Sequence, residues 1–328
     1  MKVLSIVINY RTPDITMRAV EAGQAELARI GSNCRMVVVD NDSRDGSYER
    51  LRARVRKAGW QHRVQVVRAG HNGGFAYGNN FAIRPALAWQ DPPDYFYLQN
   101  PDAFPEPGAL RALIDELQNH PEAGIAGSGI RGMDGEAHRT AFRFPSVPGE
   151  LEAYARIGPV SRLLQHHMVA LPLTGRTIRA DWVSGASMLV RRAVFEDVGL
   201  FDERFFLYFE ETDFCLRARR AGWGTLHVPD SSVIHLGSAS TGAYRGGCRM
   251  PSYWFDSRRY YFRKNHGRPY LWMSNAALLV GSGMFRLRRA IEGYRADDEP
   301  RRFVRDFVTH TIRRRTDQSA RSVTPDHA

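Results

Sequence analysis

The sequence predicts an α/β fold, with a Rossmann-like, mostly parallel central sheet flanked by helices and a helical extension at its C-terminal end. Three observations predict it. Short apolar runs rich in Val, Ile and Tyr recur through residues 1–130, segments with helical spacing of apolar residues separate them, and aromatic and basic residues interleave after about residue 253. With 328 residues, 43% of them hydrophobic, the chain can form one large α/β domain or two smaller ones.

Strands and helices are expected to alternate in the N-terminal part. Buried strands are predicted over residues 3–9, 36–40, 64–68 and 95–99. Residues 17–30 and 47–59, which separate the first three strands, have apolar residues at helical spacing. The resulting order, β-α-β-α-β, is that of a doubly wound half-domain.

The pattern then continues, breaks and returns. A helix opened by Pro107 and Gly108 is expected over residues 107–120, and a further strand over 124–130. Residues 131–181 contain Gly, Pro, Arg and short apolar pieces, which predicts loop and helix covering a site. Regular patterns return in residues 182–199, 201–223 and 225–237.

The charge of the chain indicates anionic partners. The formal net charge is +11, which suits nucleotides, nucleic acid or an anionic membrane surface without choosing between them. The segment from Met284 to Thr316 contains ten Arg and five acidic residues, so it carries about half of the net charge. A helical apolar stripe in it consists of Phe303, Val304, Phe307, Val308 and Ile312. Such a helix can lie on an anionic membrane, or it can pack its stripe on the main domain.

Targeting and disulfide signals are weak. The N-terminal MKVLSIVINYRTPD has too short an apolar run for a signal peptide or a membrane span, so it is interpreted as a first strand. Three distant cysteines without metal-binding spacing argue against a disulfide framework or a zinc site and favour a reducing compartment.

Polar residues follow each of the first four predicted strands. These are Asn9-Tyr10-Arg11, Asp40-Asn41-Asp42-Ser43, Arg68 before HNGGFAYGNN, and Asn100-Pro101-Asp102. Ligands of open α/β sheets bind outside the carboxyl ends of the strands, so these residues are candidates for a site. Each end alone is also typical of a turn or a helix cap.

The glycine-rich stretch over residues 71–80 is neither a GxGxxG dinucleotide motif nor a P-loop. Gly73 and Gly74 can let the backbone approach a phosphate or a sugar, and Asn79 and Asn80 are expected to open the next helix.

Two acidic groups are candidates for chemistry. Asp102, with Asn100 beside it, is the best candidate for a ligand of Mg²⁺, which takes few carboxylates and shares its shell with phosphate oxygens. His235, at a strand end, is a candidate further ligand, although a single His is more often structural.

The second group, Glu210, Glu211 and Asp213, follows an apolar run that contains Phe206, Tyr208 and Phe209. Acids here can simply favour a helix N-terminus. A carboxylate desolvated by these aromatic residues would instead have a raised pKa and serve as a general base.

The ordered set of motifs resembles the inverting family 2 glycosyltransferases of GT-A fold, particularly the bacterial rhamnosyltransferase-like branch. In chain order the motifs are SIVINYR, VVVDNDSRDGS, NGGFAYGNN, YLQNPDA, WVSGASMLVRR, GLFDERFFLYFEETDFCLR, VIHLGSAS and YYFRKNHG. They cover roughly residues 3–270, and the set is specific where each motif alone is loose.

The resemblance implies a division of the chain. Residues 1–252 would form the GT-A catalytic domain, with a nucleotide-binding half over about 1–130 and an acceptor half over about 131–252. Residues 253–318 would form a basic, aromatic-rich helical extension able to associate with a membrane, and 319–328 a disordered tail.

The resemblance also implies roles for residues. The nucleotide would contact Val7, Asn9, Tyr10, Arg11, Asp40, Asn41, Ser43, Gly74, Asn79 and Asn100, with Asp40 at the base. Asp102 would hold a divalent cation, Mg²⁺ or Mn²⁺, against the diphosphate, with His235 as a further ligand. Asn100 departs from a strict DxD motif, which removes one charge and puts the strength of metal binding in doubt.

The catalytic base falls on Glu211. Many members have Glu-Asp where this chain has Glu210-Glu211, so Glu210 or Asp213 stay open as alternatives. Trp182, Gly185 and Ala186, with Asp213, would lie near the donor sugar or the acceptor.

The implied activity is sugar transfer with inversion, with dTDP-L-rhamnose as the hypothetical donor among dTDP- and UDP-sugars and a polyprenyl-diphosphate-linked or other glycan as acceptor. The protein would be cytoplasmic or peripheral on the inner face of the membrane, with no nucleic-acid partner. The alternatives are a nucleotidyltransferase, whose usual Gly/Arg/Lys signature after the first strand is missing, a nucleic-acid-binding protein, and a non-catalytic carbohydrate-binding relative.

Overall fold

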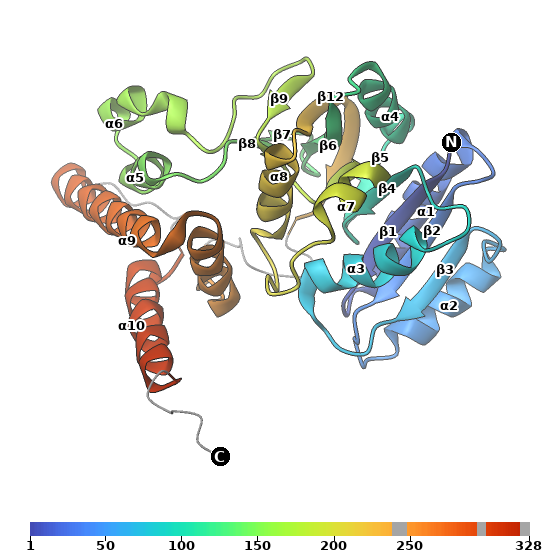
Figure 1. Ribbon diagram of the computed structural model, residues 1–328, viewed down its shortest axis with the longest axis horizontal. Helices are drawn as coiled ribbons and strands as arrows, with labels where there is room; N and C mark the ends of the chain where they lie inside the picture. The colour runs from blue at the N-terminus through green and yellow to red at the C-terminus, as the bar shows by residue number, and fades with distance from the viewer. Residues whose placement is uncertain (238–247, 294–299, 322–328) are drawn as a thin grey trace. The chain divides into compact units, whose positions relative to one another are not determined.

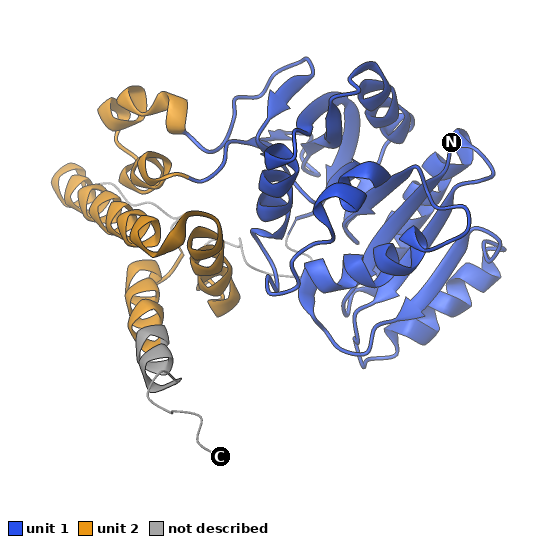
Figure 2. Cartoon of the chain, viewed as in Figure 1, with its two compact units in different colours: residues 1–145, 168–240 blue, residues 146–167, 241–328 orange. Residues whose placement is uncertain are grey.

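A mixed α/β sheet with helices against both faces forms the larger part of the protein (Figure 1). The computed structural model describes residues 1–237, 248–293 and 300–321, with side chains described as far as residue 313. The chain divides into two compact units, coloured separately in Figure 2: unit 1 comprises residues 1–145 and 168–240, and unit 2 comprises residues 146–167 and 241–328.

Unit 1 contains the sheet and the helices packed on it. In chain order its elements are β1 (Val3–Asn9), α1 (Pro13–Ile30), β2 (Arg35–Asp40), α2 (Ser47–Lys57), β3 (Val64–Arg68), α3 (Gly74–Leu87), β4 (Tyr95–Gln99), β5 (Ala103–Pro105), α4 (Ala109–Asn119), β6 (Ala123–Arg131), β7 (Ala137–His138), β8 (Ala141–Phe142), β9 (Ile178–Ala180), β10 (Trp182–Val183), β11 (Ser187–Arg191), α7 (Arg192–Val198), α8 (Glu210–Arg220) and β12 (Gly224–His235).

The sheet has the strand order β3-β2-β1-β4-β11-β6-β12-β5. Strands β3, β2, β1 and β4 run parallel, β11 is antiparallel to both of its neighbours, and β12 runs parallel to β6 and antiparallel to β5. In the parallel part Asn9 is in register with Asp40, and Asp40 with Arg68. The polar residues that follow these strands therefore meet at one edge of the sheet.

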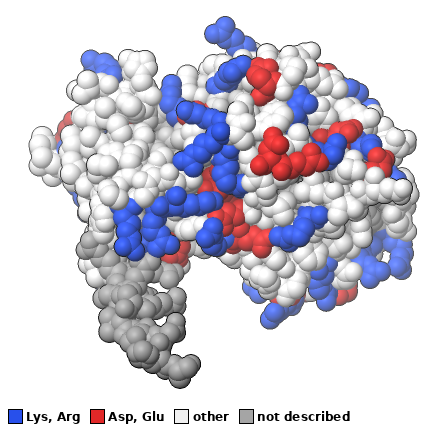
Figure 3. Space-filling model, in the orientation of Figure 1, with Lys and Arg blue, Asp and Glu red and all other residues white. Residues whose placement is uncertain are grey.

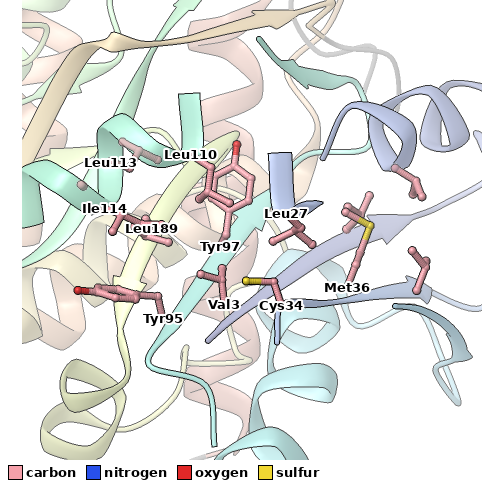
Figure 4. Close-up of a cluster of buried hydrophobic side chains, with 14 of the residues drawn as sticks. Val3, Leu27, Cys34, Met36, Tyr95, Tyr97, Leu110, Leu113, Ile114 and Leu189 are labelled. Carbon is pink, nitrogen blue, oxygen red and sulfur yellow. The ribbon is translucent and has the colours of Figure 1, made fainter. Parts of the chain in front are cut away.

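Alternation along the strands builds a core on each face. In β1, Val3 and Val7 point into the cluster that α1, α2 and α4 cover, while Leu4, Ile6 and Ile8 point into the cluster that α3, α7 and α8 cover. Figure 4 shows part of the first cluster, in which Tyr97 and Leu27 lie among aliphatic side chains. Both faces of the sheet are thus buried, which is why its strands are continuous apolar runs.

The predicted strands are confirmed at 3–9, 64–68 and 95–99, and within one residue at 36–40. The first helix begins at Pro13, four residues before the predicted start. The helix predicted over residues 107–120 is present, and Gly108 opens it as a left-handed N-terminal cap (φ 93°), so α4 begins at Ala109, two residues after the predicted start.

Unit 2 is helical. It contains α5 (Val147–Ala155), α6 (Gly158–Leu163), the 3₁₀ turn η1 (Gln165–His167), α9 (Ser252–Glu292) and α10 (Phe303–Arg321). Gly267 has non-helical dihedrals, so α9 consists of two helices joined at a kink. No helix in the described parts of the chain is long and apolar enough to cross a membrane.

The apolar stripe near the C-terminus was expected either to lie on a membrane or to pack on the main domain, and the burial of its side chains distinguishes the two. Phe303 and Phe307 of α10 are buried against Phe255 and Leu278 of α9, and Val304 and Val308 pack beside them. Packing on α9 of unit 2, rather than on the main domain, therefore accounts for four residues of the stripe, while the fifth, Ile312, is exposed. The helix continues to Arg321, and residues 322–328 of the predicted tail lie outside the described residues. The division into a catalytic domain over 1–252 and an extension stays a prediction.

Candidate active site

The ends of β1 and β2 form a buried polar cluster. The Asn9 amide donates to Asp40 Oδ1 (2.7 Å) and to Ser43 Oγ (3.1 Å), and the Ser43 hydroxyl donates to Asp40 Oδ1 (2.6 Å). Arg11 joins the cluster because its backbone N–H donates to Ser43 Oγ (2.9 Å) and its Nε to the Ser43 carbonyl (3.2 Å). Its guanidinium lies 5.1 Å from the centre of the Tyr10 ring. These five predicted residues are brought together.

Asn41 connects this cluster to the start of α3. Its Nδ2 donates to Asn72 Oδ1 (2.9 Å) and to the Gly74 carbonyl (3.1 Å), and Asn72 Oδ1 also accepts from the Gly74 N–H (3.1 Å). The Oδ1 atom of Asn41 is buried without a hydrogen-bond partner among the described residues. Because a buried amide oxygen normally accepts a hydrogen bond, this atom is a candidate contact for a ligand.

Gly74 is a point of close backbone approach. It has φ of 82°, and a Cβ atom there would lie 1.7 Å from the Phe206 carbonyl oxygen. The next N–H, of Phe75, donates to that oxygen (2.9 Å). The glycine therefore lets the start of α3 bind the loop that leads into α8.

The expectation that Asn79 and Asn80 open this helix is wrong. The helix begins at Gly74, so both lie in its second turn and are buried. Asn79 donates to the Phe75 carbonyl one turn earlier (3.0 Å), and Asn80 holds Phe201 through both its N–H and its C=O. The left-handed Gly74 sets the helix start, which residue preferences alone did not indicate.

Asp102, His235 and Asn100 meet at the other side of the site. Antiparallel pairing of β5 and β12 sets His235 opposite Ala103, beside Asp102. His235 Nε2 lies 3.1 Å from Asp102 Oδ1 and 3.4 Å from Asn100 Nδ2. The side chain of Asp102 is largely buried and that of His235 is partly exposed.

This pair is compatible with a divalent cation. Two neighbouring ligands of an octahedral ion at about 2.1 Å are about 3.0 Å apart, close to the separation of the two atoms in the structure. Among the described residues, however, no group of three or more His, Cys, Asp or Glu side chains comes together. A cation here would therefore need oxygen ligands from a bound anion or water, as Mg²⁺ and Mn²⁺ commonly have.

Glu210 and Glu211 form the N-terminus of α8 after a strained turn. Tyr208 and Phe209 are both left-handed, with φ of 68°, which is unfavourable for aromatic residues. Burial raises the pKa of Glu211 to about 7, and the nearby backbone N–H groups of Glu211 and Gly185 oppose this rise. Burial and then the charge of Glu211 raise the pKa of Glu210 well above its ordinary value. One oxygen of each carboxyl group has no hydrogen-bond partner among the described residues.

Gly185 and Ala186 join the two acidic groups. Gly185 lies beside the Glu211 carboxyl group, since a Cβ atom added to it would lie 3.8 Å from Glu211 Oε1, while the Ala186 carbonyl accepts from the Asn100 N–H (2.9 Å). A Cβ atom on Gly185 would lie 3.2 Å from the Phe75 ring. Adjacent residues, Gly185 and Ala186, thus lie beside a carboxyl group with a pKa near neutrality and beside the Asn100 segment, which suits proton removal next to a bound anionic group.

The structure does not bring three predicted residues into these clusters. Val7 is fully buried in the core, two residues before the end of β1. Trp182 stacks on Phe142 (4.1 Å between ring centres) and donates to the Arg143 carbonyl (3.0 Å). Asp213 is buried and forms an ion pair with Arg217 (3.0 Å).

Three further residues, which were not predicted from the sequence, support the site. Thr16 donates to Asn9 Oδ1 (2.8 Å), Asn72 orients Asn41, and Phe75 packs against Gly185. The signal for Asn72 and Phe75 was their place on either side of Gly73 and Gly74. No local pattern singles out Thr16, which lies inside a helix.

Comparisons with known proteins agree with the fold and the motif order. Residues 2–259 match the model of a family described as glycosyltransferase like family 2. The N-acetylglucosaminyl-diphospho-decaprenol L-rhamnosyltransferase of Mycobacterium tuberculosis is 31% identical over 220 residues, which are 63% of this chain and 68% of that protein. The rhamnosyltransferase WbbL of Escherichia coli is 29% identical over 168 residues, 49% of this chain and 60% of its own length.

Among solved structures, the mannosyltransferase PcManGT from Pyrobaculum calidifontis, in complex with GDP-Man and Mn²⁺, is similar with a TM-score of 0.56. The match covers 98% of this chain and 81% of that one at 15% sequence identity. At this identity the likeness concerns the fold, which is the GT-A-like arrangement of a mostly parallel sheet flanked by helices.

Proposed function

The chain belongs to glycosyltransferase family 2, and from this premise we propose that it transfers L-rhamnose from dTDP-L-rhamnose, with inversion, to a hydroxyl group of a lipid-linked glycan. One observation carries the proposal most directly: a carboxyl group with a pKa of about 7, that of Glu211, lies beside Gly185, and the next residue, Ala186, binds the Asn100 N–H.

Glu211 is proposed as the general base. Its ionised form takes the proton of the acceptor hydroxyl while that oxygen attacks the anomeric carbon, and the bond to the nucleoside diphosphate breaks on the opposite side. One displacement inverts the anomeric configuration. A pKa near neutrality makes the carboxylate basic enough for this transfer while it is still substantially ionised at neutral pH.

The nucleotide is proposed to bind at the ends of β1 and β2. Asp40 accepts hydrogen bonds from Asn9 and Ser43, which fix its carboxylate at the sheet edge. Asn41 Oδ1, which has no partner in the described parts of the chain, supplies a further acceptor. Fixed acceptors of this kind suit the N–H groups of a pyrimidine base or the hydroxyl groups of a sugar.

Asp102 and His235 are proposed to hold a divalent cation, Mg²⁺ or Mn²⁺. When bound, the cation would neutralise charge on the diphosphate leaving group. The support is the 3.1 Å separation of the two side-chain atoms and their place beside Asn100.

The identities of donor and acceptor rest on relatives. The names of the two relatives specify rhamnosyl transfer, and one of them names a diphospho-decaprenol acceptor. The choice of rhamnose and of a polyprenyl-diphosphate-linked glycan for this chain is made on that basis.

Donor binding and turnover test the proposal together. Purified protein with Mn²⁺ or Mg²⁺ is assayed against dTDP-, UDP- and GDP-sugars, with the anomeric configuration of the product determined by NMR. We expect metal-dependent binding of dTDP-L-rhamnose, its loss in Asp102→Ala, and retained binding with turnover lowered about 10²- to 10⁴-fold in Glu211→Gln.

The matched control is Glu196→Gln, which changes an exposed glutamate of α7 and should leave binding and turnover as they are. Retention of configuration, or normal turnover by Glu211→Gln, would overturn the proposed base. Tight binding of another nucleotide sugar would overturn the proposed donor alone.

A further inference from the structure

The second helix of α9, from Arg268 to Glu292, has two different faces. Its inner face packs within unit 2, through Leu271, Leu278 and Phe285, which are buried. At Gly281 the approach of α5 is so close that a Cβ atom would lie 2.9 Å from the Leu151 carbonyl oxygen. This side of the helix is fully used by internal packing.

The other face is apolar but exposed. Nine exposed residues between 272 and 291 follow one another at intervals of one, three or four positions, which places them on one side of the helix. They are Trp272, Met273, Ala276, Leu279, Val280, Gly283, Leu287, Ala290 and Ile291. Val280, Leu287 and Ile291 are 56%, 65% and 75% exposed. We call these nine residues the outer face of α9. It extends over twenty residues, about 30 Å at the helical rise.

A continuous apolar face of this length is unusual on a protein surface that contacts only water. The apolar stripe of α10 differs from this face in its burial, because Phe303 and Phe307 of that helix are only 4% exposed. Four of the five residues of the α10 stripe are thus packed, with Ile312 exposed, whereas the outer face of α9 is exposed along its length.

Charge indicates which partner fits. From Arg268 to Glu292 the chain contains four Arg and one acidic residue, Glu292, which forms an ion pair with Arg288 (2.8 Å). Arg286, Arg288 and Arg289 cluster at the end of the outer face, and Arg263 and Lys264 precede its start. An apolar face bordered by arginines at its ends is the pattern of a helix that lies in the interface of an anionic bilayer.

A second copy of this chain fits less well. Two outer faces packed together would bring basic ends near basic ends in either orientation, since both ends of the helix carry Arg or Lys. Like charges at close range oppose association. The helix also fails the requirement of length and apolarity for crossing a membrane, as do the other described helices.

We propose that the outer face of α9 is a docking surface for an anionic lipid bilayer, with the helix parallel to the membrane plane. Val280 and Leu287 enter the boundary between headgroups and acyl chains, and the arginines contact lipid phosphates. The inference goes beyond sugar transfer, and its test needs neither donor nor acceptor.

Vesicle binding of the full chain tests it. The probes are vesicles of phosphatidylcholine alone and of phosphatidylcholine mixed with phosphatidylglycerol, in a flotation assay at low and high salt. We expect binding to the mixed vesicles that weakens with salt, and a loss of about tenfold or more in Val280→Asp/Leu287→Asp. Both positions are exposed, so the substitutions leave the packing of unit 2 unchanged, which circular dichroism verifies.

The matched control is Met133→Asp/Ile312→Asp, which adds two carboxylates at positions 66% and 57% exposed, one in unit 1 and one on α10. It should bind like the unchanged protein. Four outcomes overturn the proposal: no binding of the unchanged protein, equal binding to neutral vesicles, equal loss in the control, or a dimer that only the α9 variant dissociates while vesicles are ignored. A transferase that is inactive in solution but floats with anionic vesicles would leave this inference standing.

Discussion

Glu211 is buried enough to titrate near neutrality, and this fixes the expected pH dependence of the reaction. A general base must be ionised, and the pKa of Glu211 is raised to about 7. We therefore expect the rate of transfer to fall about tenfold per pH unit as the pH decreases below about 7, and to level off above it.

The pH profile with saturating donor is the measurement. Glu211→Asp should keep a profile of the same shape with a lower plateau, because the shorter carboxylate lies farther from the acceptor. A rate that is flat from pH 5 to 8 in the unchanged protein would contradict the role of Glu211, whatever the effect of its removal.

Glu210 is more deeply buried than Glu211, and we expect its titration to affect the stability of the fold. Its pKa is raised well above the ordinary 4.5 in the folded protein, so between these values the folded state binds more protons than the unfolded state. Stability is therefore greatest at low pH in this window and is lost as the pH rises, by at most about 1.4 kcal/mol per pH unit for the group.

Glu210→Gln removes this titration. We expect the free energy of unfolding to depend less on pH from about 5 to 8 in the variant than in the unchanged protein, measured by urea denaturation across that range. Parallel curves for the two proteins would show that Glu210 is ionised in the folded state. Glu196→Gln again serves as the exposed control.

At the scale of elements, the start of α3 determines how the loop before α8 is held. Gly74→Ala introduces a Cβ atom 1.7 Å from the Phe206 carbonyl at a φ of 82°. Gly135 has the same φ, and a Cβ atom there meets nothing within 4 Å. We expect Gly74→Ala to be destabilised by about 1–3 kcal/mol more than Gly135→Ala, since both share the cost of a left-handed alanine and only one must shift a neighbour.

Thermal unfolding of the two variants measures the difference, and the donor assay should show lower turnover for Gly74→Ala only. The comparison isolates close approach from backbone conformation. If the two variants are equally stable, the contact between the start of α3 and Phe206 contributes little.

The elements that could be predicted are those whose signal is local. Residues 3–9, 64–68 and 95–99 are short runs buried on both faces, and the β-α-β order brings their ends to one edge. This was enough to place Asn9, Asp40 and Ser43 together before any geometry was known, because register follows from parallel pairing.

Contacts between residues far apart in the sequence could not be predicted from local patterns. Residues 146–167 pack with the C-terminal helices, although they lie between two stretches of unit 1. The bond of Asn80 to Phe201 joins residues 121 apart, and no period of apolar residues encodes it. The contact of His235 with Asp102 needed the pairing of β12 with β5, a strand of three residues that is too short to recognise.

At the scale of the whole molecule, charge is distributed unevenly along the sequence. The net charge of +11 has about half of its excess between residues 284 and 316. Over the face of unit 1 drawn in Figure 3, basic side chains are interspersed with acidic ones. A protein that binds the phosphate backbone of a nucleic acid would instead present a basic stripe, so this face does not favour such a partner.

Unit 2 depends on a buried ion pair. Arg258, which is 1% exposed, donates to Glu150 Oε2 from Nη2 (2.6 Å) and Nε (3.1 Å), and to Asn275 Oδ1 (2.8 Å). Glu150 lies in α5, and Arg258 and Asn275 lie on either side of the kink at Gly267. One guanidinium thus binds α5 and both halves of α9 together.

Removal of Arg258 leaves the Glu150 carboxylate buried without its partner. We expect Arg258→Met to destabilise unit 2 by about 3–5 kcal/mol, measured by calorimetry of the full chain, and Arg258→Met/Glu150→Met to recover most of this loss. The exposed ion pair between Arg249 and Asp306 gives the control, and Arg249→Met should have a much smaller effect because solvent screens that pair. If the double variant is no more stable than Arg258→Met, the loss comes from the contacts of Arg258 with Phe262 and Phe307 rather than from an isolated charge.

The position of the outer face of α9 depends on the same network, so a destabilised Arg258→Met should also bind anionic vesicles less well than the unchanged protein, whereas the double variant should bind them normally.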